Sequence, residues 1–339
     1  MLTLIKNVDI MAAYSHDQSA VFGGNPMTAM EKVVPSEANV AFTQENHPNN
    51  PRLQRIVLSE KGLNAFEAAT SQWGLQAIEY KPFLRFAVAN ALDEACCGAL
   101  SPVLNQIMQT REQGAFLFEY EGTPDMDASE FHVKLSTAIS HLIGVPNFDA
   151  MYGKFYARFT VRNKDDSDSY LRQAHRRMEL HNDGTYVNER TDFVIMMKMK
   201  EENMEGGDSL ILHIDDWQDL ERFYHHPLAK QDIQWGSPPS KQVDYKVHHP
   251  VFFEEDQNGK PHMLFIDQFA EPQNMRQGLY LHQMGESLEA EENCSNIEVP
   301  VGSMLVLQNH CWLHGRDKFV AHPGLERELL RQRGHFSDN

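Results

Sequence analysis

The chain has 339 residues, 41% of them hydrophobic, which is enough to bury a substantial core without disulfides. Its formal net charge of -18 excludes a general nucleic-acid-binding surface, because phosphate recognition depends on clustered Lys and Arg. The longest apolar stretches, such as residues 193–197, are far shorter than the roughly 20 residues of a membrane helix, so no membrane partner is expected.

The cysteines and the N-terminus point to the cytoplasm. The four cysteines are too few and too irregularly spaced for a disulfide framework, and none forms a C-x-x-C zinc pair. The first residues lack the basic start, the long apolar stretch and the small-residue cleavage site of an export signal. We therefore expect a protein of a reducing, cytoplasmic environment.

The first half of the chain is predicted to be mainly helical after an irregular start. Residues 1–50 are rich in Asn, Pro, Ser and Ala without periodicity, and are expected to form an irregular N-terminal arm. Helical signals dominate from 59 to 143, with helices expected at 59–73, 82–109 and 129–142. The sequence GAFLFEY at 114–120 predicts a strand among them.

The second half reads as β-rich. Short β-like runs separated by turn signals follow Gly144, at 154–161, 192–200, 208–214, 250–253 and 262–266. The Asn258-Gly259 pair predicts that the last two runs form a hairpin. Helices followed by strands can cover a sheet core in one unit, so we expect an α+β fold. Residues 51–339 would form a single domain, with a helical cover at 59–143 and a β-rich core at 144–336.

The sequence MELHNDGTYV contains a histidine and an acid at a spacing typical of metal ligands. His181 and Asp183 are two residues apart, so on a strand their side chains project from one face and can converge on an ion. As third ligand we choose His314, because the preceding apolar run SMLVL predicts a strand there. Two imidazoles and one carboxylate leave other metal positions open, which suits non-haem Fe(II).

From the residues alone, other readings of this pattern stay open. An isolated H-x-D is also typical of a surface histidine hydrogen-bonded to a carboxylate. His310 competes with His314 as third ligand, because spacing does not separate the two. Zinc hydrolases use the same ligand types with an open position, so the ligand set does not exclude that class.

Several motifs in a fixed order resemble the Fe(II)/2-oxoglutarate oxygenases of the taurine-dioxygenase and clavaminate-synthase group. The segment H-N-D beginning at His181 resembles their H-x-D, and His314 resembles the distal ligand. The segment GGDSL resembles a Gly-Gly-x-Thr that hydrogen-bonds the keto acid, with Ser209 in place of Thr. RELLR resembles an R-x-x-x-R motif whose first arginine, here Arg327, holds the distal carboxylate of 2-oxoglutarate.

A longer resemblance, to the CsiD family of glutarate 2-hydroxylases, covers nearly the whole chain from about residue 52. It rests on LRFAVANALDE (84–94), HLIGVPNFDAM (141–151), NKDDSDSYLRQAHRRMELHNDGTYV (163–187) and WLHGRDKF (312–319). The resemblance implies a double-stranded β-helix (jelly-roll) with flanking helices, a cytoplasmic homotetramer, and conversion of glutarate to L-2-hydroxyglutarate. It also implies Fe(II) as the metal, and 2-oxoglutarate and O2 as co-substrates that yield succinate and CO2.

Arginines near the C-terminus indicate two anionic ligands. The far carboxylate of a metal-chelating keto acid needs neutralising, for which a planar guanidinium is suited. On a strand, Arg327, Arg331 and Arg333 share one face, which is more positive charge than one keto acid requires. We therefore expect Arg331 and Arg333 to bind the substrate. Residues 325–333 also fit an amphipathic helix, which propensity favours, and only the resemblance indicates a strand.

Two further residues are candidates for substrate binding, and other functions compete with the oxygenase. Tyr156 and Arg158 alternate on another predicted strand and could line the pocket, although core packing or an ion pair explains them equally well. A metal-dependent hydrolase would keep the triad without needing Ser209 and Arg327. A non-catalytic dicarboxylate sensor would keep the arginines without iron. Within the oxygenases, the alternative substrate is another small acid, such as a sulfonate or a longer dicarboxylate.

Overall fold

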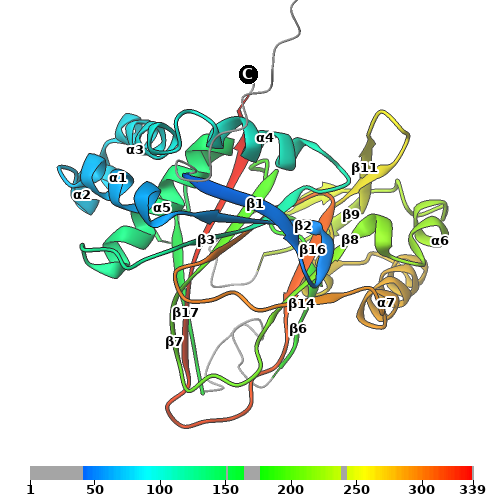
Figure 1. Ribbon diagram of the computed structural model, residues 1–339. Coiled ribbons are helices and arrows are strands. Elements are labelled where there is room, and N and C mark those ends of the chain that lie inside the picture. Colours follow the sequence, from blue (N-terminus) through cyan, green and yellow to red (C-terminus); the bar gives the residue numbers. More distant parts are fainter. Residues whose placement is uncertain (1–40, 150–151, 164–175, 238–242, 338–339) are drawn as a thin grey trace, which may run out of the picture. The chain divides into compact units, whose positions relative to one another are not determined.

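Two β-sheets of unequal size organise the computed structural model, which describes residues 41–149, 152–163, 176–237 and 243–337 (Figure 1). The larger sheet contains, in spatial order, β1 (Phe42–His47), β2 (Asn50–Leu58), β3 (Ala115–Tyr120), β15 (Met304–Gln308), β7 (Phe193–Glu202), β17 (Glu326–Phe336) and β4 (Gly144–Pro146), with β5 (Ala157–Arg162) also paired to β17. The smaller sheet contains β14 (Ser295–Ile297), β8 (Ser209–His213), β16 (Trp312–Arg316) and β6 (Met178–His181). Short pairings are made by β10 (Val247–His249), β9 (Ile233–Trp235) and β13 (Ala270–Glu271), and by β11 (Phe252–Glu255) with β12 (Pro261–Met263).

Helices cover the outer face of each sheet. The larger sheet shares a hydrophobic core with α1 (Glu60–Thr70), α2 (Leu75–Tyr80), α3 (Pro82–Ala95), α4 (Leu100–Gln109) and α5 (Ala128–Ile143). The smaller sheet shares a second core with α6 (Leu220–Tyr224) and α7 (Met275–Glu289). A third core joins the two sheets, with Leu117 and Leu305 from the larger and Ile211 and Trp312 from the smaller. The mixed α+β class predicted from the sequence is confirmed.

Capping side chains satisfy a backbone N–H group in the first turn of α1, α5 and α7. Ser59, the first residue of the helix expected over 59–73, accepts a hydrogen bond from the Gly62 N–H as the N-cap of α1. The single helix expected over 82–109 is wrong, because Cys97 and Gly98 have φ values of 56° and 72° and separate α3 from α4. No helix in the described residues is long and apolar enough to cross a membrane.

The irregular arm expected over residues 1–50 is wrong for its last part, while residues 1–40 lie outside the described residues. β1 and β2 form an antiparallel hairpin in which Phe42 pairs with Leu58. The Pro- and Asn-rich segment at 47–50, interpreted as part of a linker, is the turn of this hairpin. β2 then pairs in parallel with β3, which fixes the hairpin to the edge of the larger sheet.

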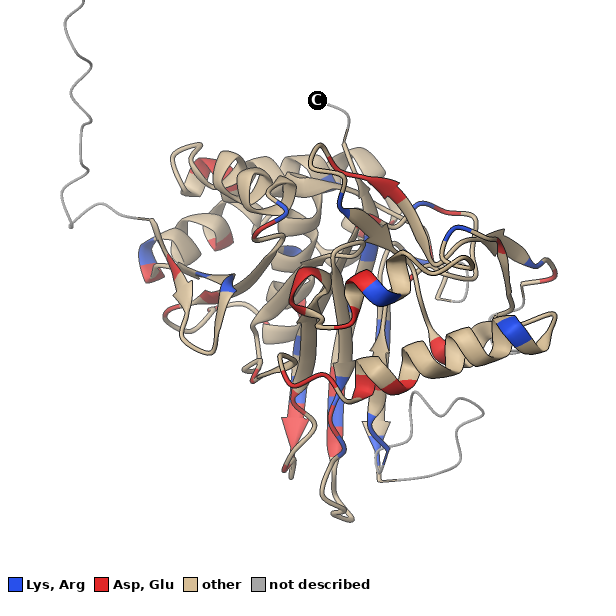
Figure 2. Ribbon diagram, turned by 90° about the vertical axis from the view of Figure 1, so that its right-hand side faces the viewer, with Lys and Arg blue, Asp and Glu red and all other residues tan. Residues whose placement is uncertain are grey.

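The strands expected in the second half are present, with shifted ends. β5, β7 and β8 correspond to the runs predicted at 154–161, 192–200 and 208–214. The predicted hairpin is confirmed by the antiparallel pairing of β11 with β12, and Gly259 in its turn has a φ of 73°. Acidic and basic residues are interspersed toward the ends of the long strands (Figure 2). There, Glu326 pairs with both Arg162 and Lys200 at 3.0 Å.

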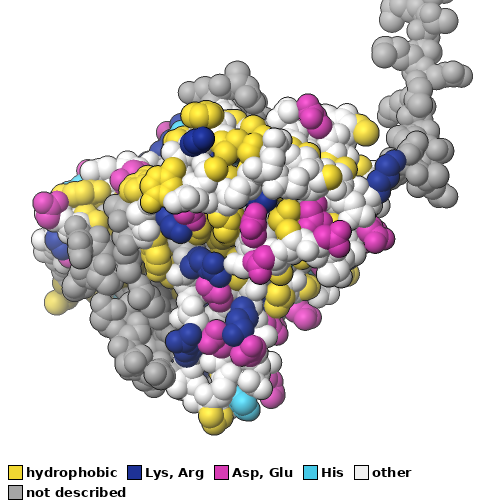
Figure 3. All heavy atoms as spheres, turned by 90° about the vertical axis from the view of Figure 1, so that its left-hand side faces the viewer, with side chains coloured by type: hydrophobic (Ala, Val, Ile, Leu, Met, Phe, Trp, Pro, Cys, Tyr) yellow, Lys and Arg dark blue, Asp and Glu magenta, His cyan; other side chains and the backbone are white. Residues whose placement is uncertain are grey.

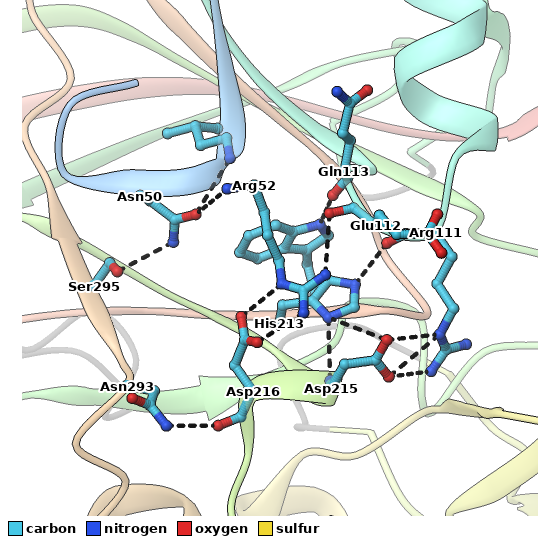
Figure 4. A network of polar contacts seen from close by, with 12 residues as sticks. Asn50, Arg52, Arg111, Glu112, Gln113, His213, Asp215, Asp216, Asn293 and Ser295 are labelled. Carbon is cyan, nitrogen blue, oxygen red and sulfur yellow. Dashed lines mark hydrogen bonds and ion pairs between the residues drawn. The ribbon is translucent and has the colours of Figure 1, made fainter. Parts of the chain in front are cut away.

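A polar network ties the segment after α4 and the β1–β2 hairpin to the end of β8 (Figure 4). Arg111 donates to Asp215 at 2.8 Å, and Arg52 donates to both carboxylate oxygens of Asp216 at 2.7 and 2.8 Å. His213 donates from Nε2 to the Arg111 carbonyl at 2.9 Å and accepts the Asp215 N–H at Nδ1 at 3.1 Å. Burial lowers the pKa of His213 to about 4, so the ring is neutral at pH 7.

Candidate active site

The smaller sheet brings His181, Asp183 and His314 together. His181 ends β6 and lies opposite His314 of β16 in the antiparallel register, and Asp183 follows β6 by two residues. One ligand atom from each side chain lies within 4.8 Å of the other two. All three residues are buried. Strand pairing, which sequence spacing does not reveal, therefore selects His314 as the residue next to the H-x-D.

Both histidines are held in a form that can bind a metal. The Nδ1–H of His181 donates to the Glu179 carbonyl at 2.8 Å, which leaves Nε2, 3.9 Å from Asp183 Oδ1, as the electron-pair donor. Burial, together with the nearby His181 ring, lowers the pKa of His314 to about 3, so that ring is neutral. Its Nδ1 is buried without a hydrogen-bond partner among the described residues.

Asp183 is ionised although it is buried. Burial by itself would raise the pKa of this carboxyl group, but the surrounding groups, with the positive charge of Arg331 the largest among them, together outweigh burial and keep the pKa well below the usual range. The Asp183 Oδ2 lies 3.1 Å from Arg331 Nη1 and accepts no hydrogen bond within the described part of the chain. Two imidazoles and a carboxylate are the donor set expected for a non-haem Fe(II) site.

His310 lies outside this cluster. Its ring packs edge-on against Phe253, with centroids 5.0 Å apart, and its Nδ1 is 3.9 Å from Asp192. Burial lowers the pKa of His310 to about 4. The residue is a neutral core histidine, and the ambiguity between the two histidines is resolved by position.

The segment containing the C-terminal arginines is strand β17, so the helical alternative is wrong. β17 pairs with β7 on one side and with β5 on the other. Arg331 extends from this strand toward the triad: besides Asp183, it lies 3.6 Å from Asp149, and its guanidinium is 4.7 Å from the Phe159 ring centroid. The charge of Arg333 also lowers the pKa of Asp183.

Arg327, four residues before Arg331 on the same strand, lies in a second region that is buried and positively charged. It is 5% exposed, and its Nε has no hydrogen-bond partner among the described residues. Burial and the nearby Arg316 charge lower its pKa to about 10, so it remains a cation at pH 7. Arg327 and Arg316 both lie over the Phe319 ring, at 5.9 and 4.8 Å from its centroid. Two adjacent buried guanidinium groups favour an anionic ligand.

Ser209 belongs to this region through strand pairing, since it lies opposite Arg316 in the β8–β16 register. The preceding Gly206 and Gly207 have φ values of 77° and 75°, and a Cβ on Gly207 would lie 2.1 Å from the Phe319 ring. Glycine is therefore required at this turn. The sequence interpretation missed Arg316 as part of the region, although its position two residues after His314 on one strand could have indicated it.

The two remaining substrate candidates are placed elsewhere. Arg158 lies opposite Leu330, whose side chain faces the helical core, and it donates to Glu328 at 2.7 Å and to Ser129 of α5 at 3.2 Å. Tyr156 donates to Glu79 instead of facing the triad. Their predicted role in the pocket is wrong. Arg158 forms an ion pair with Glu328, and Tyr156 packs in the core.

Solved structures with a similar fold include two iron oxygenases. Asparagine oxygenase in complex with Fe(II), 2S,3S-3-hydroxyasparagine and succinate is similar with a TM-score of 0.65 at 16% identity, over 83% of this chain and 93% of its own. The oxygenase OrfP in complex with Fe and alpha-ketoglutaric acid is similar with a TM-score of 0.61 at 16% identity, over 84% and 94% of the two chains. At these identities the likeness concerns the fold alone.

Sequence comparison identifies the family to which the chain belongs. Residues 42–336 match the CsiD family model, and the chain belongs to that family. Glutarate 2-hydroxylase of Salmonella typhimurium strain LT2 is 49% identical over 302 residues, which are 89% of this chain and 93% of that protein. Glutarate 2-hydroxylase of Citrobacter koseri is 48% identical over 315 residues, 92% of this chain and 97% of the relative.

Proposed function

We propose that this protein is an Fe(II)- and 2-oxoglutarate-dependent dioxygenase that hydroxylates glutarate at C2 to L-2-hydroxyglutarate. 2-Oxoglutarate and O2 would be converted to succinate and CO2 in the same turnover. The observation that carries the proposal is the position of Arg327 and Arg331 on one strand that passes the His181, Asp183 and His314 cluster. The relatives named glutarate 2-hydroxylase support the choice of substrate.

The described residues fit an iron ion. Three donor side chains converge, both histidines have a nitrogen that is not occupied by a protein partner, and the carboxylate is ionised. His181, Asp183 and His314 would hold Fe(II) on one face and leave positions for the keto acid and O2. Bound iron supplies oxygen activation and cleavage of the substrate C–H bond, while the protein supplies orientation.

In this proposal Arg327 binds the distal carboxylate of 2-oxoglutarate. Its guanidinium is buried, cationic and close to a second arginine, so a carboxylate that enters would neutralise charge in a site with little water. Ser209 would donate its hydroxyl hydrogen to the same carboxylate. OrfP, which shares the fold, is known in complex with Fe and alpha-ketoglutaric acid.

Glutarate would be held by Arg331 and Arg333. Burial acts to lower the pKa of Arg331, but Asp183 and the other acidic groups around it, including Asp149, together keep this pKa above its ordinary value. This arginine therefore carries a permanent charge beside the metal ligands. A substrate carboxylate bound there would lie close to the iron position, which leaves the adjacent C2 facing it. The second carboxylate of glutarate would pair with Arg333, whose charge acts on the same site.

The fold, assembly and location are proposed on the same basis. The two sheets with their flanking helices would form a double-stranded β-helix, and residues from about 42 onward would act as one oxygenase domain. We propose a cytoplasmic homotetramer, since all four cysteines are free and hydrophobic side chains are exposed on the helical face (Figure 3). Tyr80 is 78% exposed and Phe83 74%, which favours self-association. Sedimentation equilibrium would test the tetramer.

One experiment tests the reaction. Protein purified without oxygen is mixed with Fe(II), 2-oxoglutarate and glutarate, oxygen is admitted, and succinate and 2-hydroxyglutarate are quantified by chiral chromatography. We expect equal amounts of succinate and 2-hydroxyglutarate, with the 2-hydroxyglutarate in the L configuration. Succinate without 2-hydroxyglutarate would refute the glutarate assignment, and bound metal with neither product would refute the oxygenase and favour a hydrolase or a sensor.

A further inference from the structure

Two buried asparagines hold the backbone around Asp183. Asn309, between β15 and β16, is 1% exposed. Its Oδ1 accepts the Asp183 N–H at 2.9 Å, and its Nδ2 donates to the carbonyls of Asp183 at 2.8 Å and Thr191 at 2.9 Å. Both main-chain polar groups of Asp183 are thus bound by one side chain. Two hydrogen bonds to one residue fix the position and the direction of its backbone.

The second asparagine completes the arrangement from the other side. Asn182, between two metal-binding candidates in the sequence, is fully buried. Its Nδ2 donates to the carbonyls of Asn309 at 2.5 Å and Trp312 at 3.1 Å, and its Oδ1 accepts the Phe265 N–H at 2.9 Å. The two amides therefore join the segment after β6 to the turn that leads into β16.

The side chains of Asn182 and Asn309 are placed to orient Asp183 and not to contact a ligand themselves. The hydrogen-bonding groups of both amides are used by main-chain partners, so neither side chain has a polar atom to offer a metal or a substrate. Asp183 lies beyond the last residue of β6 and precedes Gly184, whose φ is 87°, so no regular strand pairing orients it. The Asp183 carboxylate also faces Arg331 at 3.1 Å, which attracts it away from the histidines.

We propose that Asn309, assisted by Asn182, is a positioning residue that sets the Asp183 carboxylate for metal binding before the metal arrives. This inference rests on the metal site of the proposed function. Asn182 binds two carbonyl groups at the turn before His314, and Asn309 belongs to that turn, so the two residues fix the two halves of the ligand set relative to one another. Loss of such a supporting group lowers metal affinity by about 10- to 100-fold in other metal proteins.

The test is a titration of metal-free protein with Co(II). Binding is measured by calorimetry and by the visible absorption of the bound ion. Asn309→Ala is expected to weaken Co(II) binding by about tenfold or more and to change the absorption spectrum. Asn309→Ser, which retains a small hydrogen-bonding group, should recover part of the affinity and decides the question if the alanine variant does not fold. Thermal unfolding is measured for every variant.

Asn105 provides the matched control. Its Nδ2 also donates to two backbone carbonyls, those of Ser101 and Leu142 at 2.9 Å, but it joins α4 to the end of α5. Asn105→Ala should lower the melting temperature and leave Co(II) binding unchanged. A folded Asn309 variant that binds Co(II) as wild type does would overturn the inference, whereas wild-type protein that binds no Co(II) would refute the metal site itself.

Discussion

The guanidinium of Arg331 lies 3.1 Å from the carboxylate of Asp183, across the space between the larger and the smaller sheet. A cation from one sheet thereby contacts a proposed metal ligand attached to the other. Arg331 helps to keep the carboxylate ionised, yet it competes with a metal for the same oxygen atoms. The pair predicts that metal affinity and substrate affinity respond differently to one substitution.

Replacing Arg331 with methionine is expected to raise the KM for glutarate by roughly 30-fold or more, because a buried partner of the substrate carboxylate is lost. Co(II) affinity should be unchanged or stronger, since a competing cation is removed. Steady-state kinetics and a Co(II) titration measure the two effects. Loss of metal binding with an unchanged KM would show that Arg331 supports the metal site and does not bind substrate.

The two neighbouring histidines are distinguished by a pair of variants. His314→Ala should abolish detectable Co(II) binding and turnover, because two ligands remain of three. His310→Ala removes a ring that packs against Phe253 and should reduce stability while metal binding is retained. Calorimetric titration of both variants with Co(II) measures these effects. Comparable losses of metal affinity would contradict the assignment of His314 as the third ligand.

The role of Arg327 is tested by its replacement with methionine. Because no other cation could fully replace a buried guanidinium, the KM for 2-oxoglutarate should rise by about 100-fold while the KM for glutarate changes little. Arg162→Met is the control, since Arg162 is on the adjacent strand in an exposed pair with Glu326. Succinate formation measured at varied 2-oxoglutarate provides both constants. Equal effects of the two substitutions would remove Arg327 from the keto-acid site.

Acid should destabilise the folded protein through His213. Its pKa is about 4 in the folded state and near 6.5 when unfolded, so between these values the unfolded chain binds more protons. The stabilising contribution is complete above pH 6.5 and decreases as the pH falls toward 4, by up to about 1.4 kcal/mol per pH unit. Urea unfolding of metal-free wild type and His213→Gln at pH 7, 6 and 5 should show a smaller loss in the variant. Parallel losses would contradict the prediction.

Arg158 should matter little for catalysis. Its pair with Glu328 is partly exposed, and such pairs contribute about 0–1 kcal/mol to stability. Arg158→Ala is therefore expected to leave the KM for glutarate unchanged and to lower the free energy of unfolding by less than about 1 kcal/mol. Kinetics and urea unfolding test this, and a raised KM would return Arg158 to the substrate site.

Local patterns were sufficient where the structure is local, as at the Ser59 cap, the Asn258-Gly259 hairpin and the H-x-D spacing. The choice of His314 depended on the pairing of β16 with β6, which periodicity does not contain. Alternation placed Tyr156 and Arg158 on one face of a strand but could not indicate which face.

Other features leave little trace in a single sequence. Asn182 and Asn309 bind main-chain groups brought together only by the tertiary fold, so no sequence pattern indicates their role, even though Asn182 lies inside the H-x-D. The strand character of β17 was contrary to the helix propensity of LERELLRQR, because pairing with β5 and β7 outweighs a local preference. The resemblance to a family contributed that result; composition and periodicity did not.

The placement of both proposed glutarate-binding arginines on β17 limits how selectivity for the chain length of the substrate can change. Arg331 and Arg333 are two residues apart on one hydrogen-bonded strand, so their Cα atoms are separated by about 6.6 Å. Moving either arginine to the next position on the same face would shift it by about 6.6 Å, far more than one methylene group requires. Preference among diacids that differ by one carbon would therefore have to arise in the surrounding segments, such as that of Asp149, while the strand itself stays constant.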